Sequence, residues 1–173
     1  MALIDKVLAG YTATLWMQDD VTPVPLTDAQ LSTWTGQVAN IIGTSAGGTG
    51  TAGMAVPVEA IPAFGADDAV ASYSVAGART GAKITTQNQV TSMNITCAWN
   101  PADTAMLQIR DDGYGGVTVR TYTIAVYDGT DTVAYSFNAM VGGMQWDMSP
   151  SAEGKFTFVI HPVGGNSYGW SND

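Results

Sequence analysis

Charged side chains are scarce in this sequence, and basic ones are the scarcest. Charged residues make up 12 % of the chain, and six Lys and Arg against fifteen Asp and Glu give a formal net charge of −9. Affinity for nucleic acid depends on cations that displace counterions from phosphates. We therefore do not expect the chain to hold DNA or RNA, although such a surface would let DNA pass without sticking. A plainer interpretation is that the acidity only keeps the protein soluble.

Cysteine and histidine occur once each. One cysteine excludes an internal disulfide, and these counts cannot supply the usual ligand set of a zinc site. Cys97 and His161 could pair as nucleophile and base. Because Cys97 alternates with Ile95 and Trp99 on an apolar strand face, a buried small hydrophobe is the better interpretation.

Two acidic pairs, Asp67-Asp68 and Asp111-Asp112, could in principle hold calcium. Neither has the D-x-D-x-D-G spacing of a calcium loop. We interpret both pairs as solvated turns, and we expect no metal ion and no other cofactor.

A Gly/Thr-rich stretch at 43–53 contains a G-x-S-x-G match followed by a G-x-G-x-x-G match. Each motif works only where a helix follows directly. Such a helix is prevented after the first motif by the glycines that follow it. After the second motif it is prevented by Pro57 and Pro62. We interpret 43–53 as a surface loop, and we do not expect an enzyme.

No stretch approaches the roughly 18 uninterrupted apolar residues that a membrane-spanning helix needs. The N-terminal sequence MALIDKVLAGY carries Asp5 and Lys6 within its apolar run and has no basic leader. It fits neither a signal peptide nor a membrane anchor. We expect synthesis in the cytoplasm.

Hydrophobic residues make up 46 % of the chain, and 20 residues are glycine. Low charge with many Gly and Thr predicts strands and turns rather than a helical bundle, and 173 residues suit one domain, 1–173. Residues 1–10 and 163–173 are expected to be loose in the free subunit. The predicted elements are strands at 11–18, 38–42, 54–61 (interrupted by Pro57), 93–99, 117–127, 133–148 and 155–161, and a short helix within 26–34.

The region 91–128 predicts a strand, a helix and a second strand. Asn100 is a good N-cap and Pro101 suits the first helical turn, with Asp103 beside it at the positive end of the helix dipole. The expected apolar stripe is Ala102, Ala105, Met106 and Ile109, and the expected helix stop is Gly113, Gly115 and Gly116.

The segment at about 62–90 has little continuous apolar patterning. A connection of this length is unusual in a compact domain unless it works as an arm or a binding loop. Tyr73 and Val75 alternate enough to predict a long hairpin that projects from the body. Arg79 and Lys83, within it, are a third of the six basic residues.

In this order, the elements resemble the tail tube proteins of long-tailed bacteriophages, whose fold is shared with the tube of type VI secretion. The matching places are Ala13–Trp16, Pro57–Gly81, Ile95–Pro101 with Tyr122–Ile124, Val141–Met144 and Lys155–Val163. The resemblance implies a mainly β protein, an antiparallel β-sandwich or barrel with one flanking α-helix.

It also implies hexameric rings that stack into a tube around a channel for double-stranded DNA. Rings would pair or cover the open edges of the sheet. The implied partners are further copies of the chain, tape measure and tail terminator proteins, and DNA that passes without specific binding, with no membrane. The implied location is the virion tail, after assembly in the host cytoplasm. The candidate contact residues are Phe64, Asp67, Asp68, Val70, Tyr73, Val75, Arg79 and Lys83.

Two other interpretations stay open. One is a carbohydrate-binding β-sandwich that uses exposed Trp34, Trp146 or Trp170, because exposed tryptophans commonly stack on sugars. The other is a different phage part, such as a baseplate protein or a terminator ring.

Overall fold

The computed structural model describes residues 12–18, 53–64, 66–73, 82–116, 118–127, 131–149 and 153–172. The predictions for 1–10, 26–34 and 38–42, and nearly all of 43–53, lie outside these ranges. The described elements are β1 (Thr12–Met17), β2 (Met54–Val56), β3 (Val58–Ala60), β4 (Ala66–Tyr73), β5 (Ala82–Val90), β6 (Met93–Ala98), α3 (Thr104–Gly115), β7 (Val119–Tyr127), β8 (Asp131–Asp147) and β9 (Lys155–Asn172).

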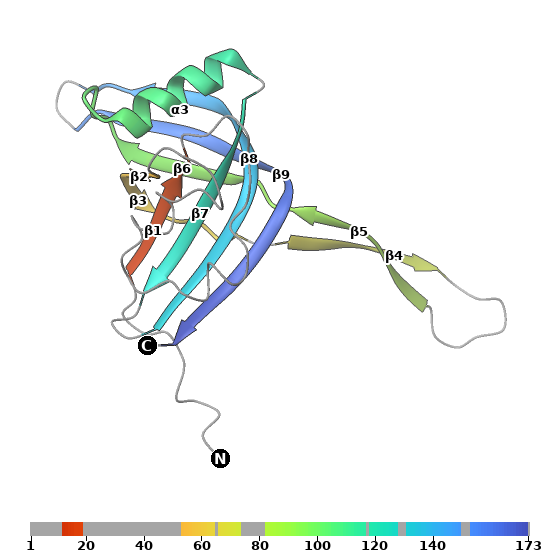
Figure 1. The fold of residues 1–173 in the computed structure, drawn as a ribbon. Helices are drawn as coiled ribbons and strands as arrows, with labels where there is room; N and C mark the ends of the chain where they lie inside the picture. Colours follow the sequence, from red (N-terminus) through yellow and green to blue (C-terminus); the bar gives the residue numbers. More distant parts are fainter. Residues whose placement is uncertain are drawn as a thin grey trace.

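Seven strands form one antiparallel sheet in the order β2-β1-β7-β8-β9-β6-β3, and α3 lies across one end of it (Figure 1). Within the described ranges, the predicted fold class, mainly β with antiparallel pairing and one flanking helix, is confirmed. The sheet is curved but is not closed into a barrel. Figure 1 shows β1, β2, β3 and β6 converging on one side of the body.

Pro57 determines how the two edges of this sheet meet. It separates β2 from β3, and proline cannot donate a ladder hydrogen bond. β2 pairs with β1 while β3 pairs with β6, so consecutive segments form opposite edges. The sheet therefore curls until its edges approach each other at Pro57. Both edge strands are short, which leaves less open border than the sequence suggested.

The hydrophobic core lies inside the curled sheet and beneath α3. The alternation predicted for β6 and for the start of β9 is confirmed, since Met93, Ile95 and Cys97 are buried, as are Phe156 and Phe158. The remaining core side chains are Leu15, Met17, Val56, Ala105, Met106, Ile109, Tyr122, Ile124, Tyr135, Phe137, Ala139, Val141 and Ile160.

The helix begins later than the sequence suggested. Asn100 is not the N-cap: its Oδ1 accepts a hydrogen bond from the Ala102 amide at 3.0 Å and closes a turn before the helix. The N-cap is Asp103, whose Oδ1 accepts from the Met106 amide at 3.0 Å. Ala102 is therefore exposed rather than part of the buried stripe. The helix ends at Gly115, and Gly116, with φ 78°, is its C-cap. Gly113, predicted as part of the helix stop, lies within the helix.

The last strand is longer than expected. Rather than closing at His161, β9 continues through Pro162 to Asn172 and pairs with β8 as far as Asp131↔Asn172. The tail after 162, expected to be loose, thus lies in the sheet up to residue 172. Pro162 stands where the register shifts beside Ala139, and an irregular ladder tolerates a missing amide donor.

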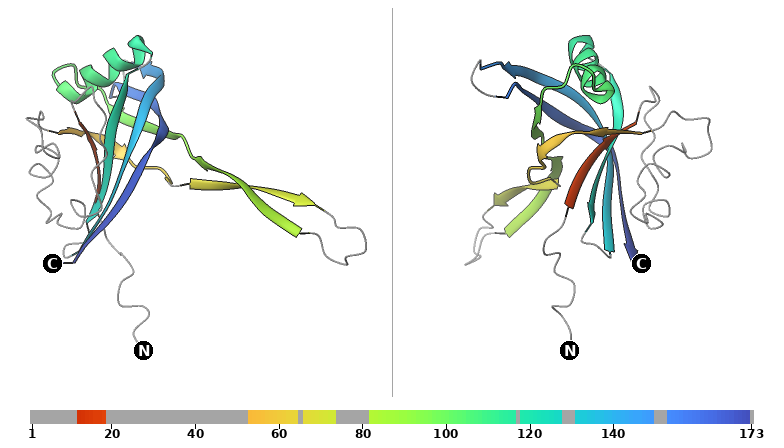
Figure 2. Two further views of the ribbon diagram at one scale, coloured as in Figure 1. Left: turned by 45° about the vertical axis from the view of Figure 1, so that its right-hand side comes forward. Right: turned by 90° about the vertical axis from the view of Figure 1, so that its left-hand side faces the viewer.

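β4 and β5 form a separate two-stranded sheet. Their antiparallel ladder runs from Ala66↔Val90 to Tyr73↔Ala82, with a register shift between Ala69 and Val70. Figures 1 and 2 show this hairpin leaving the body and extending away from it. Its root lies beside β9.

Candidate functional site

The β4–β5 hairpin carries most of the contact residues proposed from the sequence. Asp67, Asp68, Val70 and Tyr73 lie on β4, and Lys83 lies on β5 opposite Ser72. Val75 and Arg79 lie outside the described residues. Asp67 and Asp68 are therefore in a paired strand, and the interpretation of this acidic pair as a solvated turn was wrong.

Phe64, the remaining candidate, lies at the root of the hairpin. Its ring stacks on Tyr135 of β8, with ring centroids 5.6 Å apart and 20° between the ring planes, yet 39 % of the residue is exposed. Phe64 therefore packs on its own chain and also presents an apolar edge to solvent. The first contact holds the start of the hairpin to the body.

On the other strand of the root, Ser92 follows β5 and its Oγ lies 3.0 Å from Nδ1 of His161 on β9. His161 is exposed, as is Val163 just beyond it. This contact ties the end of the hairpin to β9. His161 therefore takes part in a surface contact at the hairpin root.

Cys97 and His161 do not form a catalytic pair. Cys97 is opposite Phe156 in the β6–β9 ladder, whereas Met93, at the far end of β6, is opposite Ile160, the neighbour of His161. Burial, with the charges of Glu59 and Asp103, raises the pKa of the Cys97 thiol to about 12. The thiol is therefore protonated at neutral pH. Its interpretation as a buried small hydrophobe is confirmed.

Within the described residues, no group of His, Cys, Asp and Glu side chains is arranged to hold a metal ion. In the same part of the chain, no helix has both the length and the apolar character needed to cross a membrane.

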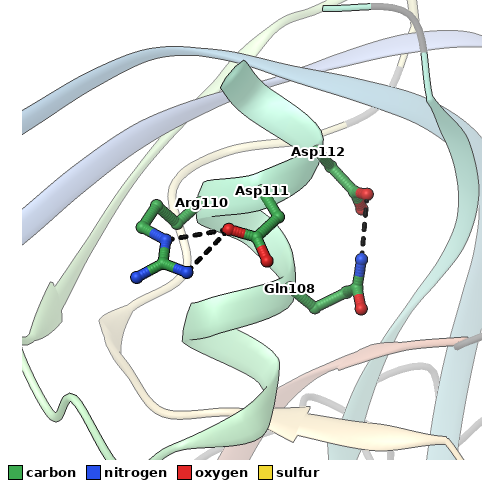
Figure 3. Close-up of polar contacts among 4 residues, drawn as sticks. All are labelled: Gln108, Arg110, Asp111 and Asp112. Carbon is green, nitrogen blue, oxygen red and sulfur yellow. Dashed lines mark hydrogen bonds and ion pairs between the residues drawn. The ribbon is translucent and has the colours of Figure 1, made fainter. Parts of the chain in front are cut away.

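The second acidic pair contains a feature that the sequence did not reveal. Asp112, expected in a solvated turn, is buried on α3 and forms a two-pronged ion pair with buried Arg120 of β7. Gln108 Nε2 also donates to Asp112 Oδ1 at 3.0 Å, while Asp111 pairs with Arg110 on the opposite side of the helix (Figure 3). A carboxylate in the last turn opposes the helix dipole, and Arg120 compensates for it.

Asp112 also affects the residue beside it in the core. Burial first, and then the negative charge of Asp112, raise the pKa of the Tyr122 hydroxyl above its usual range. The ion pair thus joins α3 to β7 within a buried environment. In the sequence, the one sign of this buried cluster is that Gln108 and Asp112 are four residues apart, which places them next to each other on one face of a helix.

A second feature not found from the sequence is an exposed aromatic surface at the end of α3. We call Trp99, Tyr114, Trp146 and Met148 the aromatic platform. Tyr114 stacks on Trp146 with ring centroids 6.3 Å apart, and Trp99 meets Trp146 edge-on at 5.9 Å. Tyr114 is 72 % exposed and Met148 is 53 % exposed.

The platform bears on the carbohydrate interpretation. Trp146 packs on Phe156 at 4.9 Å and is only half-buried, so part of its ring belongs to the core. Trp34 lies outside the described residues, and Trp170 lies on β9. Two methionine side chains pack closely against glycines near the platform. A Cβ on Gly154 would lie 2.9 Å from Met148 Sδ, and a Cβ on Gly113 would lie 2.5 Å from Met144 Sδ.

Comparison with known proteins finds similarity in fold only. No protein-family model and no curated protein matches the sequence. One similar solved chain comes from a cryo-EM structure of the anti-feeding prophage (AFP) baseplate, 6-fold symmetrised. It has a TM-score of 0.58 and 9 % identity, and the match covers 94 % of both chains.

Another comes from a cryo-EM structure of the PVC sheath/tube terminator of an extracellular contractile injection system, in the extended state. Its TM-score is 0.59 at 10 % identity, and the match covers 95 % of this chain and 98 % of that one. Such coverage shows that the whole fold is shared. Identities this low do not transfer a function.

Proposed function

We propose that this chain is a structural subunit of a phage-tail-like particle. In the specific form of the proposal it is a tail tube protein, assembling into hexameric rings that stack around a channel for double-stranded DNA. The observation that carries the proposal is the β4–β5 hairpin, which extends away from the seven-stranded sheet (Figure 2). The shared fold with chains of two such particles supports it.

The physical argument starts from the hairpin's sheet, which among the described strands consists of β4 and β5 alone. An isolated two-stranded ladder is at best marginally stable in water, and such ribbons persist when another surface covers them. β4 and β5 pair with each other and touch the body at their root. A neighbouring subunit is the natural cover, because closed rings bring the same two surfaces together at every contact.

The charge of the chain is consistent with a DNA conduit. With a net charge of −9 it offers few cations to phosphates. Three of the six basic residues, Arg110, Arg120 and Lys155, are already paired with Asp111, Asp112 and Glu59 of the same chain. A channel of this composition would not retain DNA through many phosphate contacts.

A second candidate function is a baseplate or terminator ring of such a particle. The two similar solved chains favour it, because they come from a baseplate and from a sheath/tube terminator. Tube, baseplate and terminator subunits would share the ring contact and differ in whether rings stack.

Negative-stain microscopy and sedimentation of the purified full chain test the proposal. We expect rings, and stacked tubes if the chain is a tube protein; single unstacked rings would favour the second candidate. A variant lacking residues 65–85 should remain a folded monomer. A wild-type chain that stays monomeric at high concentration, or a deletion variant that still forms rings, would refute the proposal. Binding on a glycan array by a monomer would instead favour the carbohydrate module.

A further inference from the structure

Among the residues whose side-chain burial the structure describes, which do not include those of β4 and β5, the exposed large apolar side chains fall into two groups. They are Phe64, Tyr114, Met148 and Val163. Phe64 and Val163 are at the hairpin root: Phe64 precedes β4, and Val163 follows His161, which contacts Ser92 at the end of β5. Tyr114 and Met148 belong to the aromatic platform, at the ends of α3 and β8.

The two groups lie on different sides of the body. In Figure 1 the hairpin leaves the body to the right, whereas α3 lies along the top and the ends of β8 and β9 beside it reach the upper left; the left view of Figure 2 likewise shows α3 at the top and the hairpin extending to the right. The platform is therefore out of reach of the chain's own hairpin. A second copy could reach it.

Ring symmetry requires such a pair of surfaces. A ring built by rotation joins subunits head to tail, so the projecting surface of one copy meets a different, receiving surface on the next. We propose that the aromatic platform of one copy is the seat of the β4–β5 hairpin of a neighbouring copy. The inference rests on the proposed function, and it names the receiving half of the subunit contact.

The platform has the composition of such a seat. Tyr114, Trp146 and Met148 supply flat, rigid apolar surface, and aromatic and Met side chains are enriched at the centres of protein interfaces. The rings of Trp99 and Phe156 both pack against Trp146 and also against each other, with the centroids of Trp99 and Phe156 5.3 Å apart. Little rotamer freedom is lost when a partner covers rings already held in place.

Charge complementarity favours the hairpin as the occupant. Beside the platform, Asp147 and Glu153 are exposed, and Glu59 forms an ion pair with Lys155 at 3.0 Å. All three carboxylates raise the pKa of the Lys155 ammonium. This rim carries more carboxylates than cations.

The hairpin carries two acidic residues, Asp67 and Asp68, at the root end of its ladder, whereas Lys83 lies at the distal end opposite Ser72, and Arg79 falls between the two strands in the sequence. The distal part of the hairpin is therefore the basic part. Basic residues arriving at an acidic rim would orient the contact.

A mixing experiment tests the pairing. The doubly substituted Tyr114→Ser/Met148→Ser chain keeps its hairpin and its charge but loses the apolar seat, and the 65–85 deletion keeps the seat but loses the hairpin. We expect neither to form rings, with self-association of the double variant weakened about tenfold or more. When the two variants are mixed, sedimentation should show a one-to-one dimer. The hairpin of the doubly substituted chain can still bind the platform of the deletion variant, and neither chain has a second intact surface with which to bind a third. Val163→Ser is the matched control and should assemble like wild type.

Cross-linking gives a readout that does not depend on ring formation. Because Cys97 is buried and protonated, new cysteines can be labelled selectively. A Lys83→Cys chain mixed with a Met148→Cys chain should give a covalent heterodimer with a short bismaleimide, whereas Lys83→Cys with Val163→Cys should not.

The outcomes separate the two proposals. If the deletion abolishes assembly while the Tyr114→Ser/Met148→Ser chain assembles normally, the platform is not the seat, and the proposed function stands. Loss of assembly in both without the mixed dimer, or cross-linking of position 83 to 163 rather than 148, also overturns the seat. A wild-type chain that never associates refutes both proposals.

Discussion

The body and the hairpin of this chain are both antiparallel β-structure, but they differ in what covers their faces. In the body, β7 is buried on both faces. Tyr122 and Ile124, on one face, lie in the core. Thr121 and Thr123, on the other face, are also buried, and their hydroxyls donate hydrogen bonds to the side chains of Asn138 and Ser136, respectively. In the hairpin, β4 and β5 pair with each other and with no other strand that the structure describes.

The contrast teaches where each kind of interaction acts. Burial on both faces supplies folding free energy to the body, at about 25 cal/mol for each Å² of apolar surface removed from water. Among the described strands the hairpin has no third strand beside β4 and β5, so its contribution to the fold of one subunit is expected to be small. Substitutions in the body should change stability, and substitutions in the hairpin should change association. Four measurements test this division.

The largest loss of stability is expected for Asp112→Ala. It leaves the buried guanidinium of Arg120 without its carboxylate, and breaking a buried pair from one side costs about 3–5 kcal/mol. Urea denaturation followed by circular dichroism would measure this loss. The matched control is Asp111→Ala, which removes an exposed ion pair expected to contribute about 1 kcal/mol or less. Equal losses in the two variants would show that the buried pair does not join α3 to β7.

The next effect is a loss of stability in alkali. The folded pKa of Cys97 is about 12, above its ordinary value of 9.0, so between these pH values the unfolded chain releases a proton that the folded chain keeps. Stability is therefore fully present below about pH 9 and falls as pH rises toward 12, by up to about 1.4 kcal/mol for each pH unit from this group. Tyr122 acts in the same direction at higher pH.

Cys97→Ala isolates the cysteine contribution. Denaturation curves collected between pH 8 and 11 should have a shallower pH dependence in the variant than in wild type, whatever stability the smaller side chain costs at neutral pH. Identical slopes would mean that the thiol ionises as easily in the folded chain as in the unfolded one.

A smaller loss is expected for Gly143→Ala in β8. Gly143 has φ 60°, a left-handed conformation that disfavours side chains, and a Cβ there would lie 3.0 Å from Cγ2 of Val159. A destabilisation of about 1–2 kcal/mol follows from backbone strain and crowding. Gly115→Ala, whose new Cβ would make an ordinary contact with Thr118 Oγ1 at 4.0 Å, is the control and should be neutral or slightly stabilising in thermal melts.

The smallest effect on folding is expected in the hairpin. Val70→Ala and Lys83→Ala should each change the free energy of unfolding of the monomer by about 0.5 kcal/mol or less, since both lie in a separate sheet that, among the described strands, has only two members. Their effect should appear instead as weaker association in sedimentation. A large loss of monomer stability with unchanged association would reverse the proposed division between the two regions.

Local signals in the sequence predicted much of the body. The alternation of Met93, Ile95 and Cys97, and of Phe156, Phe158 and Ile160, identified core faces because a strand's side-chain period is two residues. Pro57 was recognised as an interruption, since proline removes a ladder donor. The helix was found, but its start was placed too early because Asn100 and Asp103 are both good caps, and only the folded chain shows which one meets a free amide.

By itself, then, the sequence determined the strand–helix–strand centre, the mainly β class and the scarcity of cations, because these follow from local period and composition. The tertiary structure alone decided that Asp112 is buried against Arg120, that β2 and β3 bound opposite edges of one sheet, that β9 extends to Asn172, and that Tyr114 and Met148 form an exposed platform. Each of these depends on which distant segments meet. Spacing along a chain does not specify that, since the free energy comes from contacts made across it.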